Sequence, residues 1–346
     1  MKFEQIAARD AAGTIAAHAV RRDGLTIRKG EAIGAAEVAG LLAAGVSDVI
    51  VARLEAGDIG EDDAARQLAG RVCGAHLSVD RAFTGRANLF AQAAGVLCVD
   101  MAAVDRINEI DEAVTFATLP AFRAVVAGEM VATVKIIPFA VPQGILGQAL
   151  AAAGEDALRV AAYRPLRVGV ISTLLPGLKP TVIAKTLQVL EARLKPAGAR
   201  IAEETRVAHD EHALAQALRT LRPRCDLTIV FGASAITDRR DVIPAAIELA
   251  GGKVDHFGMP VDPGNLLLIG QLDGGLVIGA PGCARSPKEN GFDWVLQRML
   301  AGVPVTGHDI RRMGAGGLLM EIVTRPQPRE GDGSPAHGGK LGGKHG

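Results

Sequence analysis

Short apolar segments alternate with helix-like segments through residues 166–300. Residues 166–172 and 227–231 are apolar runs of the length expected for buried strands. Between them, apolar residues recur every three or four positions over residues 181–195, which predicts an amphipathic helix. Strands that alternate with helices in this way indicate an α/β domain around a mostly parallel sheet.

The sequence before this region has a less regular pattern. Residues 46–52 and 95–100 predict strands, and residues 125–137 predict a hairpin. Helical patterns lie between these apolar runs. We therefore expect residues 1–160 to form an N-terminal α+β region, with a division into two subdomains near residue 70 as an alternative.

Changes in composition set the expected boundaries. Residues 154–165 contain charged residues, a glycine and a proline, and indicate the joint between two domains. We expect the α/β domain to occupy residues 161–324. Within it, residues 266–269 and 276–279 predict an antiparallel pair around an Asp-Gly-Gly turn. Residues 325–346 are mainly Pro, Gly, His and charged residues, a composition that predicts a disordered tail.

The composition narrows the classes of function. Only 3% of residues are aromatic and the formal net charge is zero, so neither base-stacking platforms nor a dedicated nucleic-acid surface is expected. The four cysteines form no C-x-x-C pair, which predicts free thiols in a reducing compartment rather than a zinc site. No apolar run approaches the length of a membrane span. We expect a cytoplasmic protein without nucleic-acid or membrane partners.

The clearest candidate for chemistry is the stretch DLTIVFGASAITDRRDVIP at residues 226–244. Its apolar run enters a loop of small residues at 232–235, and a helical pattern opens at Val242. A strand that ends in such a loop and leads into a helix directs backbone N–H groups toward an anion. Asp241, just before the helix, has two interpretations from residue type alone: a site residue or a helix N-cap.

Three loops are expected at the carboxyl ends of the strands, at residues 172–180, 232–241 and 280–287. Ligands of open α/β sheets bind at this edge, and the turn at residues 259–265 could fold over it. These segments supply hydroxyl groups, cations and carboxylates suited to a phosphorylated ligand and a bridging Mg²⁺. The candidates by residue type are Ser172, Thr173, Lys179, Asp210, Ser234, Thr237, Asp238, Asp241, Asp262, Arg285 and Ser286. The sequence has no Walker A motif, no dinucleotide fingerprint opening a helix and no recognised catalytic triad.

The order of these motifs resembles the molybdopterin-binding domain of molybdenum cofactor biosynthesis proteins. The similarity covers residues 166–321 and runs through VGVIST at 168–173, VAHDEHALAQAL at 207–218, GASAITDRRDVIPAAI at 232–247, GMPVDPGNLLLIG at 258–270 and IGAPGCARSP at 278–287. Residues 12–33 and 43–65 look like the first part of a larger member of this group. The resemblance implies a three-layer α/β fold that binds the pterin and its phosphate, and it implies a homo-oligomer.

The resemblance also implies roles for individual residues. Asp210 and Asp241 match aspartates that assist nucleotide or metal chemistry, with Asp241 as the expected Mg²⁺ ligand. The residues implied to bind the cofactor are Ser172, Thr173, Gly232, Ser234, Asp238, Pro263, Gly264, Pro281, Gly282, Arg285 and Ser286. The chain departs from the family at Ala233, where the pattern has glycine, and at Cys283-Ala284, where Asn-Pro is common. Ligand binding tolerates these changes more easily than catalysis does.

These observations leave three hypotheses for the function. In the first, the protein binds molybdopterin or its nucleotide derivative during cofactor maturation, and any catalysis is Mg²⁺-dependent nucleotidyl transfer or molybdate insertion. In the second, it is a carrier or regulatory module without catalytic activity that delivers the pterin to a partner enzyme, and the loop departures favour this possibility. In the third, it is a general α/β protein that binds phosphorylated sugars.

Overall fold

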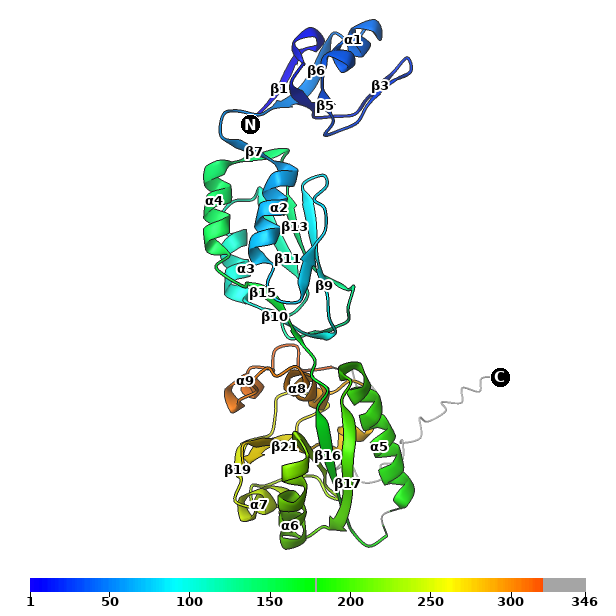
Figure 1. Ribbon diagram of the computed structural model, residues 1–346. Coiled ribbons are helices and arrows are strands. Elements are labelled where there is room, and N and C mark those ends of the chain that lie inside the picture. The colour runs from blue at the N-terminus through cyan, green and yellow to red at the C-terminus, as the bar shows by residue number, and fades with distance from the viewer. Residues whose placement is uncertain (178, 320–346) are drawn as a thin grey trace, which may run out of the picture.

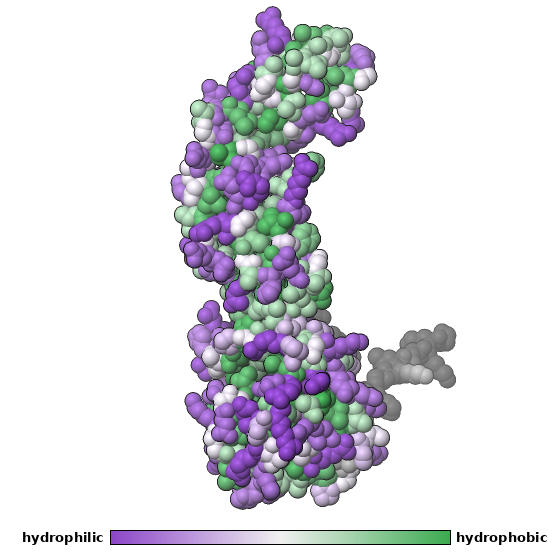
Figure 2. Space-filling view, viewed as in Figure 1, coloured by the Kyte–Doolittle hydropathy of each residue, from purple (hydrophilic) through white to green (hydrophobic). Residues whose placement is uncertain are grey.

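The computed structural model describes residues 1–177 and 179–319. Figure 1 shows an elongated molecule in which three groups of elements follow one another from the N-terminus toward the last described residues. On the face drawn in Figure 2, hydrophilic and hydrophobic residues are interspersed over all three groups. The tail predicted at residues 325–346 lies outside the described residues.

The first group packs one helix against a small antiparallel sheet. The sheet has the order β1-β6-β2-β5, and β3 and β4 pair as a separate ribbon. Its core is formed by small and aliphatic side chains such as Leu41 and Val51, which are fully buried. The elements are β1 (Lys2–Ala7), β2 (Thr14–Ala16), β3 (Val20–Arg22), β4 (Leu25–Ile27), β5 (Ala32–Ile33), α1 (Ala35–Ala43) and β6 (Asp48–Arg53).

The second group combines three helices with antiparallel strands. The strands form three sheets, β11-β13-β9-β8, β12-β10-β15 and β14-β7. Helix α2 buries Ala64, Leu68 and Val72, whose spacing places them on one face of the helix against the core. The elements are β7 (Asp58–Gly60), α2 (Glu61–Val72), β8 (Leu77–Val79), β9 (Arg86–Ala91), β10 (Gly95–Val99), α3 (Met101–Asn108), β11 (Val114–Thr118), β12 (Ala124–Val125), β13 (Met130–Ile136), β14 (Ala140–Pro142), α4 (Gln143–Ala152) and β15 (Leu158–Ala162).

One prediction for this group is wrong, and another describes its segment only in part. Residues 125–137 do not form a hairpin, because β12 pairs with β10 whereas β13 pairs with β9 and β11 in another sheet. Gly128, with a φ of 84°, turns the chain between the two sheets. The segment 154–165 is more than a joint, since β15 within it pairs with β10 along its whole length.

The third group is built around one mixed sheet of order β17-β16-β18-β21-β20-β19. Strands β17, β16, β18 and β21 are parallel, as predicted, but β20 and β19 run antiparallel to their neighbours. The expectation of a mostly parallel sheet therefore holds for one side of this sheet only. The elements are β16 (Arg167–Leu174), α5 (Pro180–Leu194), β17 (Arg200–Ala208), α6 (Glu211–Leu221), β18 (Leu227–Phe231), α7 (Val242–Leu249), β19 (Lys253–Phe257), β20 (Leu268–Leu272), β21 (Gly275–Ala280), α8 (Gly291–Leu300) and α9 (Gly307–Arg311).

The antiparallel part of the mixed sheet has a local cause. Strands β20 and β21 are joined by Asp273 and Gly274 alone, and both residues have positive φ, of 46° and 72°. A turn of two residues with positive φ closes a hairpin, whereas a parallel pair needs a long crossover. The antiparallel pair predicted from the Asp-Gly-Gly signal is confirmed.

Helices cover both faces of the mixed sheet. Because side chains alternate along a strand, Val170 faces a core that includes Leu190 of α5 and Phe292 of α8, while Ile171 faces a core that includes Leu214 of α6 and Ile243 of α7. The middle of the sheet is therefore buried on both faces.

Candidate functional site

The carboxyl ends of three neighbouring parallel strands meet at one edge of the mixed sheet. Strand β18 lies between β16 and β21, so the chain that follows each of these strands emerges side by side with the others. The segment 258–267 reaches the same edge, because β20 begins opposite Gly279 near the end of β21. The geometry thus brings together the loops that the sequence predicted at a ligand-binding edge.

A cavity of about 220 Å³ lies where two of these loops meet. Gly232, Ser234, Gly282 and Arg285, all predicted to bind the cofactor, line it. Its remaining lining residues are small: Ala233, Ala235 and Ala280. A side chain at Gly232 would stand 2.7 Å from the carbonyl oxygen of Ser234, so only glycine allows the loop to turn this tightly.

Arg285 is the cation of this cavity. Its guanidinium donates a hydrogen bond to the carbonyl oxygen of Gly232, at 2.9 Å, and its Cζ lies 5.4 Å from the centroid of the Phe231 ring. Burial lowers the pKa of this guanidinium, although an arginine stays protonated in any ordinary protein site. Within the described residues, no carboxylate forms an ion pair with Arg285. A desolvated cation that lacks an acidic partner favours an anion beside it.

Some backbone N–H groups of the loop after β18 donate to acceptors within the protein, and others do not. The N–H of Ala233 donates to the Thr173 hydroxyl at 2.8 Å, and the N–H of Thr237 donates to Asp241 at 3.1 Å. The N–H groups of Ser234 and Ala235 have no acceptor in the part of the chain that the structure describes. Two of the loop N–H groups are therefore engaged within the protein, while those of Ser234 and Ala235, two residues that line the cavity, are open to an anion.

His209 contributes to this edge and was not predicted as a site residue. Its Nδ1 lies 2.8 Å from the hydroxyl oxygen of Thr173, which is 1% exposed and also accepts the Ala233 N–H. Strands β16, β17 and β18 are thereby connected at their ends through a single hydroxyl group. The contact joins residues 36 apart in sequence, and only the pairing of β16 with β17 brings them together, so no local sequence signal reveals it.

The two aspartates predicted to be catalytic both cap helices. Asp210 accepts the Ala213 N–H at 2.9 Å at the start of α6. Asp241 accepts the Val242 N–H at 2.8 Å at the start of α7, and its other oxygen accepts the Thr237 N–H. Helix capping, the alternative for Asp241 in the sequence, therefore describes its contacts.

The aspartates at this edge accept hydrogen bonds from backbone N–H groups or pair with a cation of the protein. Across residues 1–177 and 179–319, no three His, Cys, Asp or Glu side chains gather as a metal-binding group. Asp238 pairs instead with Arg240 at 2.7 Å, and this contact lowers the pKa of the carboxyl group. Asp241 as a Mg²⁺ ligand remains a prediction.

The other predicted cofactor-binding residues lie at the same edge but do not line the cavity. Ser172 is buried within β16, opposite Phe231 of β18. The Ser286 hydroxyl accepts the Lys288 N–H at 3.2 Å, and Pro281 is buried at the start of its loop.

Pro263 and Gly264 support the start of α8. The Pro263 carbonyl accepts the Gly291 N–H at 2.8 Å, and a side chain at Gly264 would stand 2.9 Å from the Gly291 Cα. The turn predicted to fold over the edge thus packs against the helix that follows the Arg285 loop.

A second hollow, of about 250 Å³, lies between β17 and α6. Its lining contains no charged side chain: Thr205, Val207, Ala213, Gln216, Ala217, Thr220 and Leu221. A phosphorylated ligand needs cations or clustered donors, so the smaller cavity beside Arg285 is the better candidate despite its size.

The four cysteines are free thiols that are partly or fully buried. Cys73, Cys98, Cys225 and Cys283 are free, and burial raises the pKa of each thiol. A raised pKa keeps a thiol protonated and weakly nucleophilic. Among the described helices, none has the length and apolar character needed to cross a membrane.

Comparison with known proteins identifies the domain that carries this edge. Residues 170–302 match the family model described as "Probable molybdopterin binding domain". No match was found among curated proteins.

Similar solved structures include three archaeal and bacterial proteins. A molybdopterin biosynthesis MoeA protein from Pyrococcus horikoshii is 15% identical, with 89% of this chain and 76% of that chain covered and a TM-score of 0.30. CinA from Thermoplasma acidophilum, a protein of unknown function, is 16% identical (40% and 98% covered, TM-score 0.32). The molybdopterin biosynthesis enzyme MoaB from Thermus thermophilus is 18% identical (40% and 98% covered, TM-score 0.27).

These TM-scores are low, so the identification rests on the family match and not on the structural likeness. The match begins within β16 and ends just after α8, and therefore spans all three loops of the cavity edge. It confirms the resemblance seen in the sequence motifs. Residues 170–302 of this chain are thus similar to probable molybdopterin binding domains.

Proposed function

We propose that this protein binds molybdopterin, or a nucleotide derivative of it, by its phosphate during molybdenum cofactor biosynthesis. The observation that carries the proposal is Arg285, a partly buried cation without an acidic partner among the described residues, on the wall of a cavity at the carboxyl edge of the sheet. The family match of residues 170–302 supports the choice of a pterin as the ligand.

In this proposal, phosphate oxygens accept hydrogen bonds from Arg285 and from the free N–H groups of Ser234 and Ala235. Gly282 also lines the cavity, and a Cβ atom added there would meet nothing within 4 Å. A cavity of about 220 Å³ is smaller than the roughly 300–1,000 Å³ typical of small-molecule pockets. The phosphate end therefore enters, and the pterin lies over the loops outside.

A second candidate function, that of a carrier without catalytic activity, is favoured by the contacts of the aspartates. Asp210 and Asp241 accept backbone hydrogen bonds at helix starts, and among the described residues neither belongs to a group of three or more side chains that could hold a metal ion. Phosphate binding needs neither of them, whereas nucleotidyl transfer would need a positioned metal. Delivery of the pterin to a molybdoenzyme and assembly into a homo-oligomer remain predictions, to be tested by co-purification and light scattering.

Incubation of the purified protein with molybdopterin, alone and with ATP or CTP and Mg²⁺, tests both candidates. Pterin binding is followed by equilibrium titration, and turnover by release of pyrophosphate or AMP. Binding without release supports the carrier, and binding with release supports a transferase. Failure to bind molybdopterin at micromolar concentration would overturn the proposed function.

A further inference from the structure

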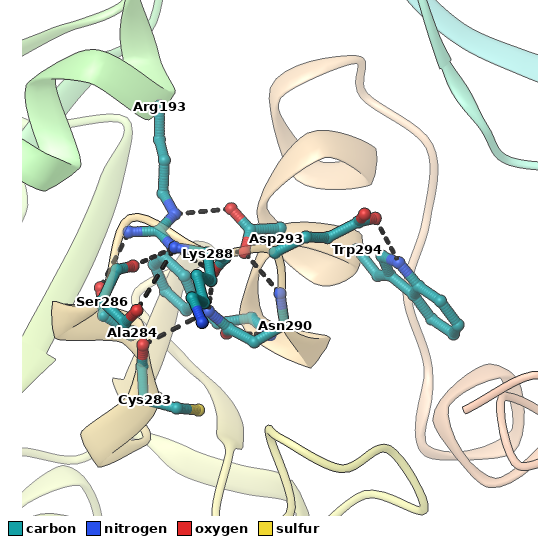
Figure 3. Close-up of polar contacts among 10 residues, drawn as sticks. Arg193, Cys283, Ala284, Ser286, Lys288, Asn290, Asp293 and Trp294 are labelled. Carbon is teal, nitrogen blue, oxygen red and sulfur yellow. Dashed lines mark hydrogen bonds and ion pairs between the residues drawn. The ribbon is translucent and has the colours of Figure 1, made fainter. Parts of the chain in front are cut away.

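Arg193, near the end of α5, reaches across to the loop that carries Arg285. Figure 3 shows its guanidinium surrounded by acceptors from residues 284–293. It binds the Asp293 carboxylate through both Nε and Nη2, and the two side chains are each 10% exposed. The Cζ also lies 5.8 Å from the centroid of the Phe292 ring. Because Asp293 neutralises its charge, Arg193 differs from Arg285 and is no candidate for binding an anion itself.

The remaining donors of Arg193 hold the backbone on both sides of Arg285. Nη1 donates to the carbonyl oxygen of Ala284 at 2.8 Å, and Nη2 donates to that of Ser286 at 2.7 Å. A third, longer contact of 3.3 Å reaches the carbonyl oxygen of Lys288. The two residues adjacent to Arg285 are thus fixed by one planar group, and this restricts the direction in which the Arg285 side chain leaves the loop.

Asn290 and Asp293 complete the support of this loop. The Asn290 amide donates to the carbonyl oxygens of Cys283 and Lys288, at 3.3 and 3.0 Å, and the Asn290 N–H donates to Asp293 at 2.9 Å. The same Asp293 carboxylate therefore orients Arg193 and completes the capping box at the start of α8, in which Asn290 is the N-cap residue. The loop carbonyls converge on this buried cluster, while Arg285 extends the other way to contact Gly232 and line the cavity.

We infer that Arg193 is a positioning residue for the anion site: it holds the backbone on either side of Arg285, so that the Arg285 guanidinium faces the cavity. The inference rests on the proposed function, in which Arg285 binds the phosphate. A guanidinium is needed here because a lysine could pair with Asp293 but has no planar fork with which to hold two further carbonyls in fixed directions. Arg193→Lys therefore keeps the charge and removes the positioning.

The first test compares molybdopterin affinity in Arg193→Lys with that in a matched control, Arg167→Lys. Arg167 also binds a carboxylate, that of Asp226, through two nitrogens, but it lies where the strands begin, at the opposite edge of the sheet. We expect Arg193→Lys to weaken binding about tenfold or more and Arg167→Lys to leave it unchanged. Equal affinity in wild type and Arg193→Lys would overturn the inference.

A double-mutant cycle with Arg285→Gln separates positioning from general destabilisation. If Arg193 acts through Arg285, then Arg193→Lys weakens binding in the wild-type background and has little further effect once Arg285 is replaced. If the double variant loses affinity by the product of the two single-variant factors, the two residues act independently. This result would contradict the inference and assign Arg193 a merely structural role.

Hydrogen exchange of the loop amides distinguishes failure of the inference from failure of the proposed function. Without ligand, we expect residues 282–290 to exchange faster in Arg193→Lys than in wild type or Arg167→Lys, and the emission of Trp294, the only tryptophan of the chain, to shift. Trp294 reports on this segment because its indole donates to Glu289 at 3.0 Å. If wild type binds no pterin, the proposed function fails. If exchange in residues 282–290 is the same in Arg193→Lys as in wild type, the positioning role of Arg193 is overturned.

Discussion

Where β16, β18 and β21 begin, Arg167 has a carboxylate partner and Arg222 has three carbonyl acceptors. Where these strands end, Arg285 has one carbonyl acceptor and no acidic partner among the described residues. Arg167 pairs with Asp226, and Arg222 donates to the carbonyl oxygens of Leu272, Cys225 and Asp273 at 2.7, 3.0 and 3.0 Å. Arg285 has a single protein acceptor in the described chain, Gly232, and a cavity beside it.

The difference separates arginines that build the fold from one that is available to a ligand. Both sets of arginines lie at the ends of strands of the same sheet. Where the guanidinium is fully satisfied by carbonyls or a carboxylate, its removal should cost stability. Where it is desolvated and lacks an anion, its removal should cost binding instead. Variants at both ends of the strands test this difference.

The largest effect on stability is expected for Arg222→Ala. The change leaves three carbonyl oxygens without their donor around a tight turn, where a side chain at Gly275 would stand only 2.7 Å from Nη2 of Arg222. We expect the free energy of unfolding to fall by about 3 kcal/mol, measured by urea denaturation with Trp294 fluorescence. Arg224→Ala, which removes an exposed pair with Glu203, is the control and should cost below about 1 kcal/mol. Equal losses in the two variants would contradict the division.

Thr173→Val should have the next largest effect. The valine keeps the shape of the side chain but leaves the Ala233 N–H and His209 Nδ1 without the hydroxyl group. The expected cost is about 2 kcal/mol, accompanied by weaker molybdopterin binding because the loop after β18 loses its anchor. Thr173→Ser retains the hydroxyl and should restore most of both properties. A valine variant as stable as wild type would show that this connection between strands does not matter.

Asp241→Ala is expected to cost about 1 kcal/mol, the usual value for a lost N-cap. Asp241→Asn keeps a capping oxygen and should be close to wild type in stability. Molybdopterin affinity should change little in either variant, since Asp241 does not line the cavity. Loss of nucleotidyl turnover in Asp241→Asn, with stability retained, would instead support the metal-binding role predicted from the sequence.

The smallest expected effect is the pH dependence of the stability contributed by the Arg167–Asp226 pair, which lies where the strands begin. Hydrogen bonds from Arg167 lower the pKa of the Asp226 carboxyl below its ordinary value. A carboxyl group whose pKa is lowered by folding stabilises the folded state at pH values above its ordinary pKa, which is near 4. This contribution is lost as the pH falls through the pKa of the folded state. Both side chains are more than a third exposed, so the contribution should be below about 1 kcal/mol. The stability difference between wild type and Asp226→Asn should narrow from pH 7 to pH 3, and a widening difference would contradict the assignment.

The sequence predicted the fold best for elements whose signal is local, within a few consecutive residues. The strand at residues 227–231 is buried on both faces and reads as one apolar run, so its bounds were predicted to the residue. The Asp273-Gly274 turn likewise carries its own signal. The hairpin predicted at residues 125–137 failed because pairing partners are chosen by the whole fold, and the same apolar pattern suits strands of two different sheets.

The candidate site was predicted in part for the same reason. The loops at residues 232–235 and 280–287 were identified from their small residues and position after strands, and Arg285 from its charge. Whether Arg285 has an acidic partner, and whether Asp241 caps a helix or faces a ligand, depends on three-dimensional contacts. Arg193 lies 91 residues before Ala284 in the sequence, so its role at the loop has no local signal.

Equilibrium titration with molybdopterin, and with the same pterin after removal of its phosphate, tests the central claim most directly. Wild type and Arg167→Gln should bind the phosphorylated form more tightly than the dephosphorylated form. Arg285→Gln should lose about 10- to 100-fold in affinity for the phosphorylated form, as expected for a charge-assisted contact, and with it the preference for phosphate. Undiminished affinity and preference in Arg285→Gln would contradict the assignment of this cavity as the phosphate site.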